Sequence, residues 1–162
     1  PHRGRHLFDH YYRNWGATSM NQSKSDRAVG YALIGFERLV TQDRVNAYAD
    51  ASGDHNPIHL DEAYAAATQF GTRIAHGMLS LALVTEMLAI EFPNTWHSGG
   101  KLKVRFTAPI IPGESVTTYG EITAIDEIHD GKRILRVATC IVGCKKPDGT
   151  DAVSGRATVP LE

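Results

Sequence analysis

The segment Ser52–His59, with the sequence SGDHNPIH, carries the densest group of side chains that can move protons. It places one carboxylate, Asp54, and two imidazoles, His55 and His59, within six residues. A carboxylate and an imidazole together can carry protons to and from a water molecule near neutral pH. The segment is therefore a candidate acid–base site.

Two other interpretations of this segment compete with the acid–base site on the residues alone. His55 and His59 have the i, i+4 spacing of helical zinc ligands, but Pro57 interrupts a helix here and no Glu follows His55. We therefore expect no metal site. The segment can also be a plain loop between two helices, in which Gly53 takes a positive φ and Pro57 stiffens the turn.

Length and charge limit the class of protein. The chain has 162 residues, of which 42% are apolar, and a formal net charge of −1. A chain of this size buries roughly 70% of the surface that its unfolded form exposes, which suffices for one hydrophobic core. Near-zero charge removes the basic field on which nucleic-acid binders depend, so no nucleic-acid partner is expected. The longest apolar run, residues 74–92, contains a Glu and several polar residues, which predicts a buried helix and no membrane partner.

The cysteines and the amino-terminal residues bear on the compartment. The first residues lack the continuous apolar stretch of a signal peptide, so we expect a cytoplasmic protein. Cys140 and Cys144 lie in a strand-like run, where four residues at about 3.3 Å each separate them by roughly 13 Å. A disulfide requires Cα atoms closer than about 7 Å, so both are expected to be free thiols.

The elements that must position the candidate site follow from capping residues and periodicity. We expect a strand at 31–39, a helix that Thr41 caps and Gly53 ends, a short helix at 61–67 and a long apolar helix at 76–91. Alternating residues and turn signals then predict four antiparallel strands, at 101–106, 116–125, 133–142 and 152–159. The fold class is therefore α+β, with a curved antiparallel sheet packed on one hydrophobic helix.

Residues 1–30 differ from the rest of the chain. They are rich in His, Arg, Asn, Ser and Gly and show little apolar periodicity. We expect a poorly packed arm or an added leader there, ahead of one domain that spans residues 31–162. His2, His6 and His10 recur every four residues, but Gly4 argues against a stable helix, and we assign no metal to them.

Residues 48–78, with SGDHNPIHLDEAYA at their centre and HGM at the start of the long helix, resemble the MaoC-like or R-specific enoyl-CoA hydratase family of hot-dog proteins. The family signature S-G-D-x-N-P-[LIV]-H and its downstream H-G-M both occur here. A looser F-x-x-P-x-x-P-G pattern follows at Phe106–Gly113. The resemblance covers residues 31–159 and implies a hot-dog fold, in which a curved antiparallel sheet wraps around a long central helix.

The resemblance also implies a reaction and its residues. Asp54 and His59 would form the catalytic dyad, Asn56 would position the water or the dyad, and the Gly77 N–H would form the oxyanion hole. The implied reaction is hydration of a trans-2-enoyl thioester to the (R)-3-hydroxyacyl product, or the reverse dehydration. Hydration places negative charge on the thioester oxygen, and a helix amino terminus faces such charge favourably. The residues expected beside the substrate are His76, Gly77, Met78 and Gly53.

The resemblance also bears on cofactors and partners. The family's reaction requires no metal or redox cofactor, because coenzyme A or a pantetheine enters as part of the acyl thioester substrate. A hot-dog sheet exposes an edge strand, so we expect a homodimer or a higher homo-oligomer. Lys101, Lys103 and Arg105 are the candidates to hold the substrate's phosphates. Ala82 stands where the family often has Ser, a difference that bears on acyl specificity.

The residues leave two alternative functions for a protein of this fold. One is a hot-dog acyl-CoA thioesterase, which would direct water at the thioester carbonyl. The other is a non-catalytic acyl-CoA-binding module. The complete set of Asp54, Asn56, His59 and Gly77 argues against both, because a thioesterase does not require it and a binding module would have no use for the dyad.

Overall fold

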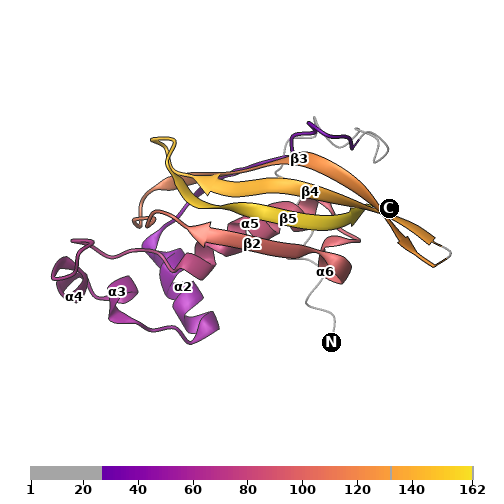
Figure 1. Cartoon of the computed structure of the whole chain (residues 1–162). Helices are drawn as coiled ribbons and strands as arrows, with labels where there is room; N and C mark the ends of the chain where they lie inside the picture. Colours follow the sequence, from indigo (N-terminus) through magenta and orange to yellow (C-terminus); the bar gives the residue numbers. More distant parts are fainter. Residues whose placement is uncertain (1–26, 132, 162) are drawn as a thin grey trace, which may run out of the picture.

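The structure is a computed structural model that describes residues 27–131 and 133–161. Its elements in chain order are β1 Glu37–Leu39, α2 Gln42–Ser52, α3 Pro57–Leu60, α4 Glu62–Ala66, α5 Gly77–Glu91, α6 Trp96–Gly99, β2 Lys101–Phe106, β3 Ser115–Asp130, β4 Arg133–Lys145 and β5 Asp151–Leu161. The strands form one antiparallel sheet in the order β1-β3-β4-β5-β2. The sheet curves over α5, and α2, α3 and α4 gather at one end of it (Figure 1). This arrangement confirms the predicted α+β hot-dog fold.

The long helix α5 packs on the sheet through one face. Its buried residues recur three or four positions apart and are Ser80, Leu83, Val84, Met87, Leu88 and Glu91. The apolar ones belong to the same core cluster as the inward side chains of β3, β4 and β5, among them Ile122, Val142 and Ala157. Each fully buried Leu or Met contributes about 1.5–3 kcal/mol. The expectation that protein surrounds the helix holds only for this face, because Met78 is 55% exposed and Ile90 39% exposed in the single chain.

Helix α2 has the two end signals predicted for it. The Thr41 side chain accepts a hydrogen bond from the Arg44 N–H at the amino end. Gly53 ends the helix with a φ of 76°, and its N–H donates to the Ala49 carbonyl at 2.8 Å. A positive φ is easily adopted only by glycine, so Gly53 turns the chain sharply into the candidate site.

The strand predicted at 31–39 is interrupted, and only Glu37–Leu39 is a regular strand. Ala32 forms an isolated bridge with Glu121. Between them, Gly35 passes so close to the Thr118 carbonyl that a β-carbon would collide with it, and the Phe36 N–H donates to the Thr118 side-chain oxygen at 2.9 Å. The regular strand ladder therefore breaks at residues 35–36, which alternation in the sequence does not reveal.

Two single-turn helices, α3 and α6, are absent from the prediction. Four residues are too few to show a helical period. In α3 the Asn56 side chain accepts from the Ile58 N–H, and Pro57 occupies the first helical position, where its missing N–H costs nothing. The plain-loop interpretation of SGDHNPIH is therefore wrong in part, because its second half is helical and carries His59.

The strands β3, β4 and β5 extend beyond the predicted bounds, whereas β2 matches them. The β3–β4 hairpin continues beyond the predicted bounds, through Ile128 with Leu135, as far as the pair of Asp130 and Arg133. Its outer part includes polar pairs such as Glu127 opposite Arg136. Hydrogen bonds from the partner strand thus extend the sheet through residues whose own pattern does not indicate a strand.

The amino-terminal part of the described chain packs on the domain. The Arg27 guanidinium donates to the Glu91 carboxylate at 3.1 Å and to the Glu91 backbone carbonyl, and it lies 4.7 Å from the centre of the Phe92 ring. The Gly30 N–H donates to the Ile122 carbonyl at 2.8 Å. Residues 27–30, which the sequence pattern places in the leading arm, therefore contact the sheet and the end of α5. The remainder of that arm, with His2, His6 and His10, lies outside the described residues.

Cys140 and Cys144 are free and buried on β4, and burial raises the pKa of each thiol to about 11. Within the described residues, every helix is too short or too polar to cross a membrane.

Candidate active site

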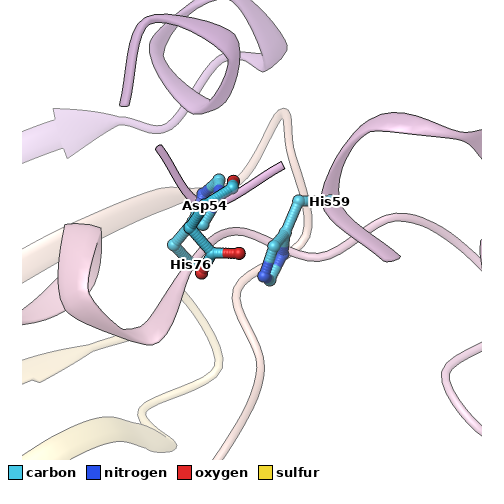
Figure 2. A group of neighbouring side chains, drawn as sticks. All are labelled: Asp54, His59 and His76. Carbon is cyan, nitrogen blue, oxygen red and sulfur yellow. The ribbon is translucent and has the colours of Figure 1, made fainter. Parts of the chain in front are cut away.

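Asp54, His59 and His76 come together from three separate elements (Figure 2). Asp54 lies between α2 and α3, His59 lies on α3, and His76 caps the amino end of α5. One carboxylate oxygen of Asp54 and one ring nitrogen of each histidine all lie within 4.8 Å of one another. Asp54 is exposed, whereas His76 is only 2% exposed. The structure thus brings the two predicted dyad residues together and adds a buried imidazole beneath them.

The His59 ring is held in one tautomer. Its Nδ1 lies 2.8 Å from the carbonyl oxygen of Ile74. A carbonyl only accepts hydrogen bonds, so Nδ1–H must donate, and neutral His59 carries its free lone pair on Nε2. The Ile74 N–H in turn donates to the Ile58 carbonyl at 3.3 Å, so the segment that contains Ile74 is bonded to α3. His59 can therefore accept a proton at Nε2.

Asp54 is oriented by its own turn. Its Oδ1 accepts from the Asn56 N–H at 3.3 Å, and its N–H donates to Ser52 Oγ at 3.2 Å. The Asn56 side chain meanwhile caps α3, since its Oδ1 accepts from the Ile58 N–H at 3.1 Å. Asn56 therefore connects the carboxylate, through its main chain, with the helix that carries His59.

The amino end of α5 offers unpaired donors. The N–H groups of Leu79 and Ser80 donate to the His76 carbonyl, whereas within residues 27–131 and 133–161 no acceptor pairs with the Gly77 N–H. The first N–H groups of a helix lack partners within the helix and carry its positive dipole end. Gly77 is exposed, and the ring of Phe106 lies against it, where an added β-carbon would be 3.3 Å from two ring carbons. An anionic oxygen can therefore approach the Gly77 N–H.

The geometry of the two imidazoles disfavours a shared metal ion. Asp54, His59 and His76 have the donor types of a zinc site. Two imidazoles on one tetrahedral zinc, with Zn–N bonds of about 2.0–2.1 Å, have ring centres roughly 5 Å apart. The centres of these rings are only 3.8 Å apart, with planes tilted by 32°, so the rings stack instead of converging on one point. The arrangement suits proton transfer better than metal binding.

Other predicted site residues have clear positions but no tested role. Met78 is 55% exposed at the start of α5, beside the Gly77 N–H, and Gly53 sets the turn that leads into Asp54. His55 is exposed and lies outside the cluster of the other three side chains. The substrate contacts expected of Met78 and Gly53 stay predictions.

The supporting roles of three residues were not found from the sequence. The Ile74 carbonyl fixes His59, the Tyr48 ring lies 4.9 Å from the His76 ring, and Phe106 covers Gly77. A backbone carbonyl has no signature in a sequence. Alternation along residues 101–106 does place Phe106 on the same side of the strand as Leu102 and Val104, but it does not show which helix residue the ring meets.

The fold and the site together define a hot-dog protein with a carboxylate and two imidazoles clustered at the amino end of its central helix. Comparison with known proteins agrees with this class. Residues 25–141 match the family model of the MaoC like domain. The 3-hydroxyacyl-thioester dehydratase Z of Mycobacterium tuberculosis is 37% identical over 114 residues, which are 67% of this chain and 76% of that protein.

Two further comparisons extend this result. The (R)-specific enoyl-CoA hydratase of Aeromonas caviae is 37% identical over 117 residues, which are 72% of this chain and 83% of that protein. The solved structure of the (R)-hydratase from A. caviae involved in PHA biosynthesis has a TM-score of 0.70 and 31% identity, over 85% of this chain and 98% of that chain. The chain therefore belongs to the MaoC-like family. It is an enzyme of the hydro-lyase class, a hydratase or dehydratase.

Proposed function

We propose that this enzyme catalyses the (R)-specific hydration of trans-2-enoyl-CoA and the reverse dehydration of 3-hydroxyacyl-CoA. One observation carries the proposal: the Asp54 carboxylate and a ring nitrogen of His59 lie within 4.8 Å of each other, and Ile74 leaves the Nε2 lone pair of His59 free. The names of the relatives in M. tuberculosis and A. caviae support the substrate class.

The proposed mechanism uses three groups. His59 takes a proton from water at Nε2 while the hydroxyl group adds to C3 of the enoyl thioester. The Gly77 N–H binds the thioester oxygen as negative charge develops on it. Asp54 orients the water and passes the proton that His59 took to C2 of the substrate. The hydroxyl group at C3 and the proton at C2 thus come from the same water, so each turnover consumes one water and no net proton. No cofactor takes part in these steps.

A cationic band on the outer face of the sheet supports binding of a coenzyme A thioester. Lys101, Lys103 and Arg105 are exposed and alternate along β2, and the strand register sets Arg156 of β5 opposite Lys103. Within the described part of the chain, none of the four pairs with a carboxylate. Strand β2 leads directly to Phe106 beside Gly77. We therefore assign the phosphates of coenzyme A to this band, because Arg and Lys bind phosphate through charge-assisted hydrogen bonds.

A homodimer is the assembly we propose. The face of α5 that bears Met78 and Ile90 is uncovered in the single chain, and β2 pairs on one side only among the described strands. Apolar residues and an open strand edge are both covered when a second copy adds its sheet. Light scattering during size-exclusion chromatography should give about twice the 17.7 kDa mass of the chain. A monomeric mass would reject the dimer.

The reaction is tested with crotonyl-CoA. Loss of the absorbance of the conjugated thioester should follow first-order kinetics without release of free thiol, and chiral chromatography should identify (R)-3-hydroxybutyryl-CoA as the product. Release of thiol without hydration would indicate a thioesterase. If neither reaction occurs with short or long enoyl chains, the protein is a binding module.

A further inference from the structure

We propose that His76 is a positioning residue of the acid–base site, which holds Asp54 and His59 in their reactive arrangement without touching the substrate. The inference rests on the proposed hydratase function and deepens it. It differs from the sequence-based expectation, in which His76 belonged to the substrate-binding residues. The contacts of both ring nitrogens and of the ring face support the new role.

The first contact joins His76 to Asp54. Nε2 of His76 lies 2.9 Å from the backbone carbonyl oxygen of Asp54. Since the carbonyl can only accept, Nε2–H donates and neutral His76 carries its proton there. The bond links the amino end of α5 to the residue that bears the carboxylate. Its donor side is buried, because His76 is 2% exposed, and the bond ties Asp54 to the Gly77 N–H that follows His76 in the chain.

The second contact joins His76 to His59. The two ring centres are 3.8 Å apart, with an angle of 32° between the planes. The His59 ring is thus held at one edge by the Ile74 carbonyl and on one face by His76. Tyr48 packs in turn on His76, with ring centres 4.9 Å apart. Rotation of the His59 ring away from this position requires its contacts with the Ile74 carbonyl and with His76 to break.

Packing alone does not explain a histidine at this position. His76 occupies the cap position of α5, yet its side chain makes no capping hydrogen bond. Its Nδ1 is buried without a hydrogen-bond partner among the described residues. A buried polar atom without a partner destabilises a fold, and an apolar side chain of similar size would avoid that loss. Retention of an imidazole at a local energetic cost is typical of a functional position.

Three variants separate the hydrogen bond from the ring contact. His76→Gln keeps an N–H near Nε2 and removes the ring, His76→Phe keeps a ring and removes the donor, and His76→Leu removes both. A small misplacement of reacting groups can cost about 100-fold in rate. We expect kcat with crotonyl-CoA to fall about 10-fold in the Gln and Phe variants and about 100-fold in the Leu variant, with KM changed less than about threefold.

A spectroscopic measurement reports on His59 directly. In protein labelled with ¹⁵N at histidine, the ring nitrogen shifts of His59 should show a single Nδ1–H tautomer in the parent and a mixture in His76→Leu. Thr118→Val is the control for stability, because Thr118 is equally buried at 2% exposure and lies on β3. It should leave the tautomer and kcat unchanged. Thermal unfolding shows which variants fold. If His76→Leu does not fold, the kcat values of His76→Gln and His76→Phe test the proposal.

The proposal is overturned if a folded His76 variant that lacks the donor or the ring keeps kcat within twofold of the parent. It is also overturned if the loss appears only in KM, which would make His76 a substrate-binding residue. Failure of the hydratase function looks different, since the parent itself would then be inactive on enoyl thioesters. The His59 tautomer would still test the contact between the two histidines in that case.

Discussion

Phe106, the last residue of β2, lies against Gly77, the first residue of α5, so that a β-carbon at position 77 would meet ring atoms Cδ1 and Cε1 at 3.3 Å. The φ of Gly77 is negative, so the backbone does not require glycine here. Space is tight, however: a β-carbon would require the Phe106 ring to shift by a few tenths of an ångström and would stand beside the N–H assigned to the oxyanion.

We therefore expect Gly77→Ala to lower kcat for crotonyl-CoA about 10- to 100-fold, the range that follows loss or misplacement of an oxyanion donor. The double variant Gly77→Ala with Phe106→Leu should recover part of this loss, because the smaller side chain makes room for the methyl group. Steady-state rates of the parent, the two single variants and the double variant measure the coupling. An unchanged kcat in Gly77→Ala would contradict the assignment.

The dyad is tested by isosteric changes. Asp54→Asn and His59→Gln remove the proton-transfer groups and keep similar shapes, so each should lower kcat by about 10²- to 10⁴-fold while the protein stays folded. His55→Gln is the matched control, since His55 is exposed, adjacent in sequence and outside the cluster, and it should keep the parental rate. Parental hydration by either dyad variant would remove that residue from the mechanism.

The cationic band should act on binding and not on chemistry. We expect Lys103→Glu combined with Arg156→Glu to raise KM for crotonyl-CoA about 10-fold, with kcat nearly unchanged, because two attractive charges become repulsive. Added salt screens these charges, so it should raise the KM of the parent for crotonyl-CoA toward the KM of the double variant. A crotonyl thioester of N-acetylcysteamine lacks the phosphates, so its KM should not change. Equal effects on both thioesters would place the phosphates elsewhere.

The pair of Arg27 and the buried Glu91 should stabilise the fold. The side chains are 17% and 4% exposed and lie 3.1 Å apart. Removing one partner leaves a buried charge unpaired, so Arg27→Met should lower the free energy of unfolding by about 3–5 kcal/mol in urea titrations. Glu62→Gln, which breaks the exposed pair with Arg73, is the control and should cost less than about 1 kcal/mol. A similar small effect at Arg27 would show that its contact is dispensable.

Stability should fall at alkaline pH. Burial raises the pKa of Tyr119 to about 12, aided by its hydrogen bond to Asp151, and burial raises the pKa of Cys140 and Cys144 to about 11. A group whose pKa is higher in the folded state stabilises the fold fully below its unfolded-state pKa and loses that contribution as the pH rises to the folded-state value. The ordinary values are 9.0 for the thiols and 10.0 for tyrosine.

The free energy of unfolding in urea should therefore decrease between about pH 9 and pH 12. Of these three groups, only Tyr119 titrates at the top of this range. In Tyr119→Phe the free energy of unfolding should therefore decrease less above pH 10 than in the parent. Identical slopes in the parent and Tyr119→Phe would show that this hydroxyl is equally free in the folded and unfolded states.

Local signals in the sequence were sufficient for the ends of α2, for β2 and for the motif. Thr41 and Gly53 mark the two ends of α2 because capping is an interaction between near neighbours. The strand β2 was predicted to the residue by alternation. Asp54, His59 and Gly77 could be singled out because their types and spacing are characteristic of a family whose membership the comparisons confirm.

What the sequence by itself determined is therefore the fold class, the family and the position of the candidate dyad in the chain. Only the tertiary structure decided that Ile74 holds one nitrogen of His59, that His76 packs beneath the dyad, and that Phe106 covers Gly77. It also decided that the strand predicted at 31–39 breaks at Gly35. The reason is physical: these contacts join residues from 15 to 83 positions apart or involve main-chain atoms, which are the same at every position. Residue types and periodicity describe near neighbours, and packing of the complete chain settles the rest.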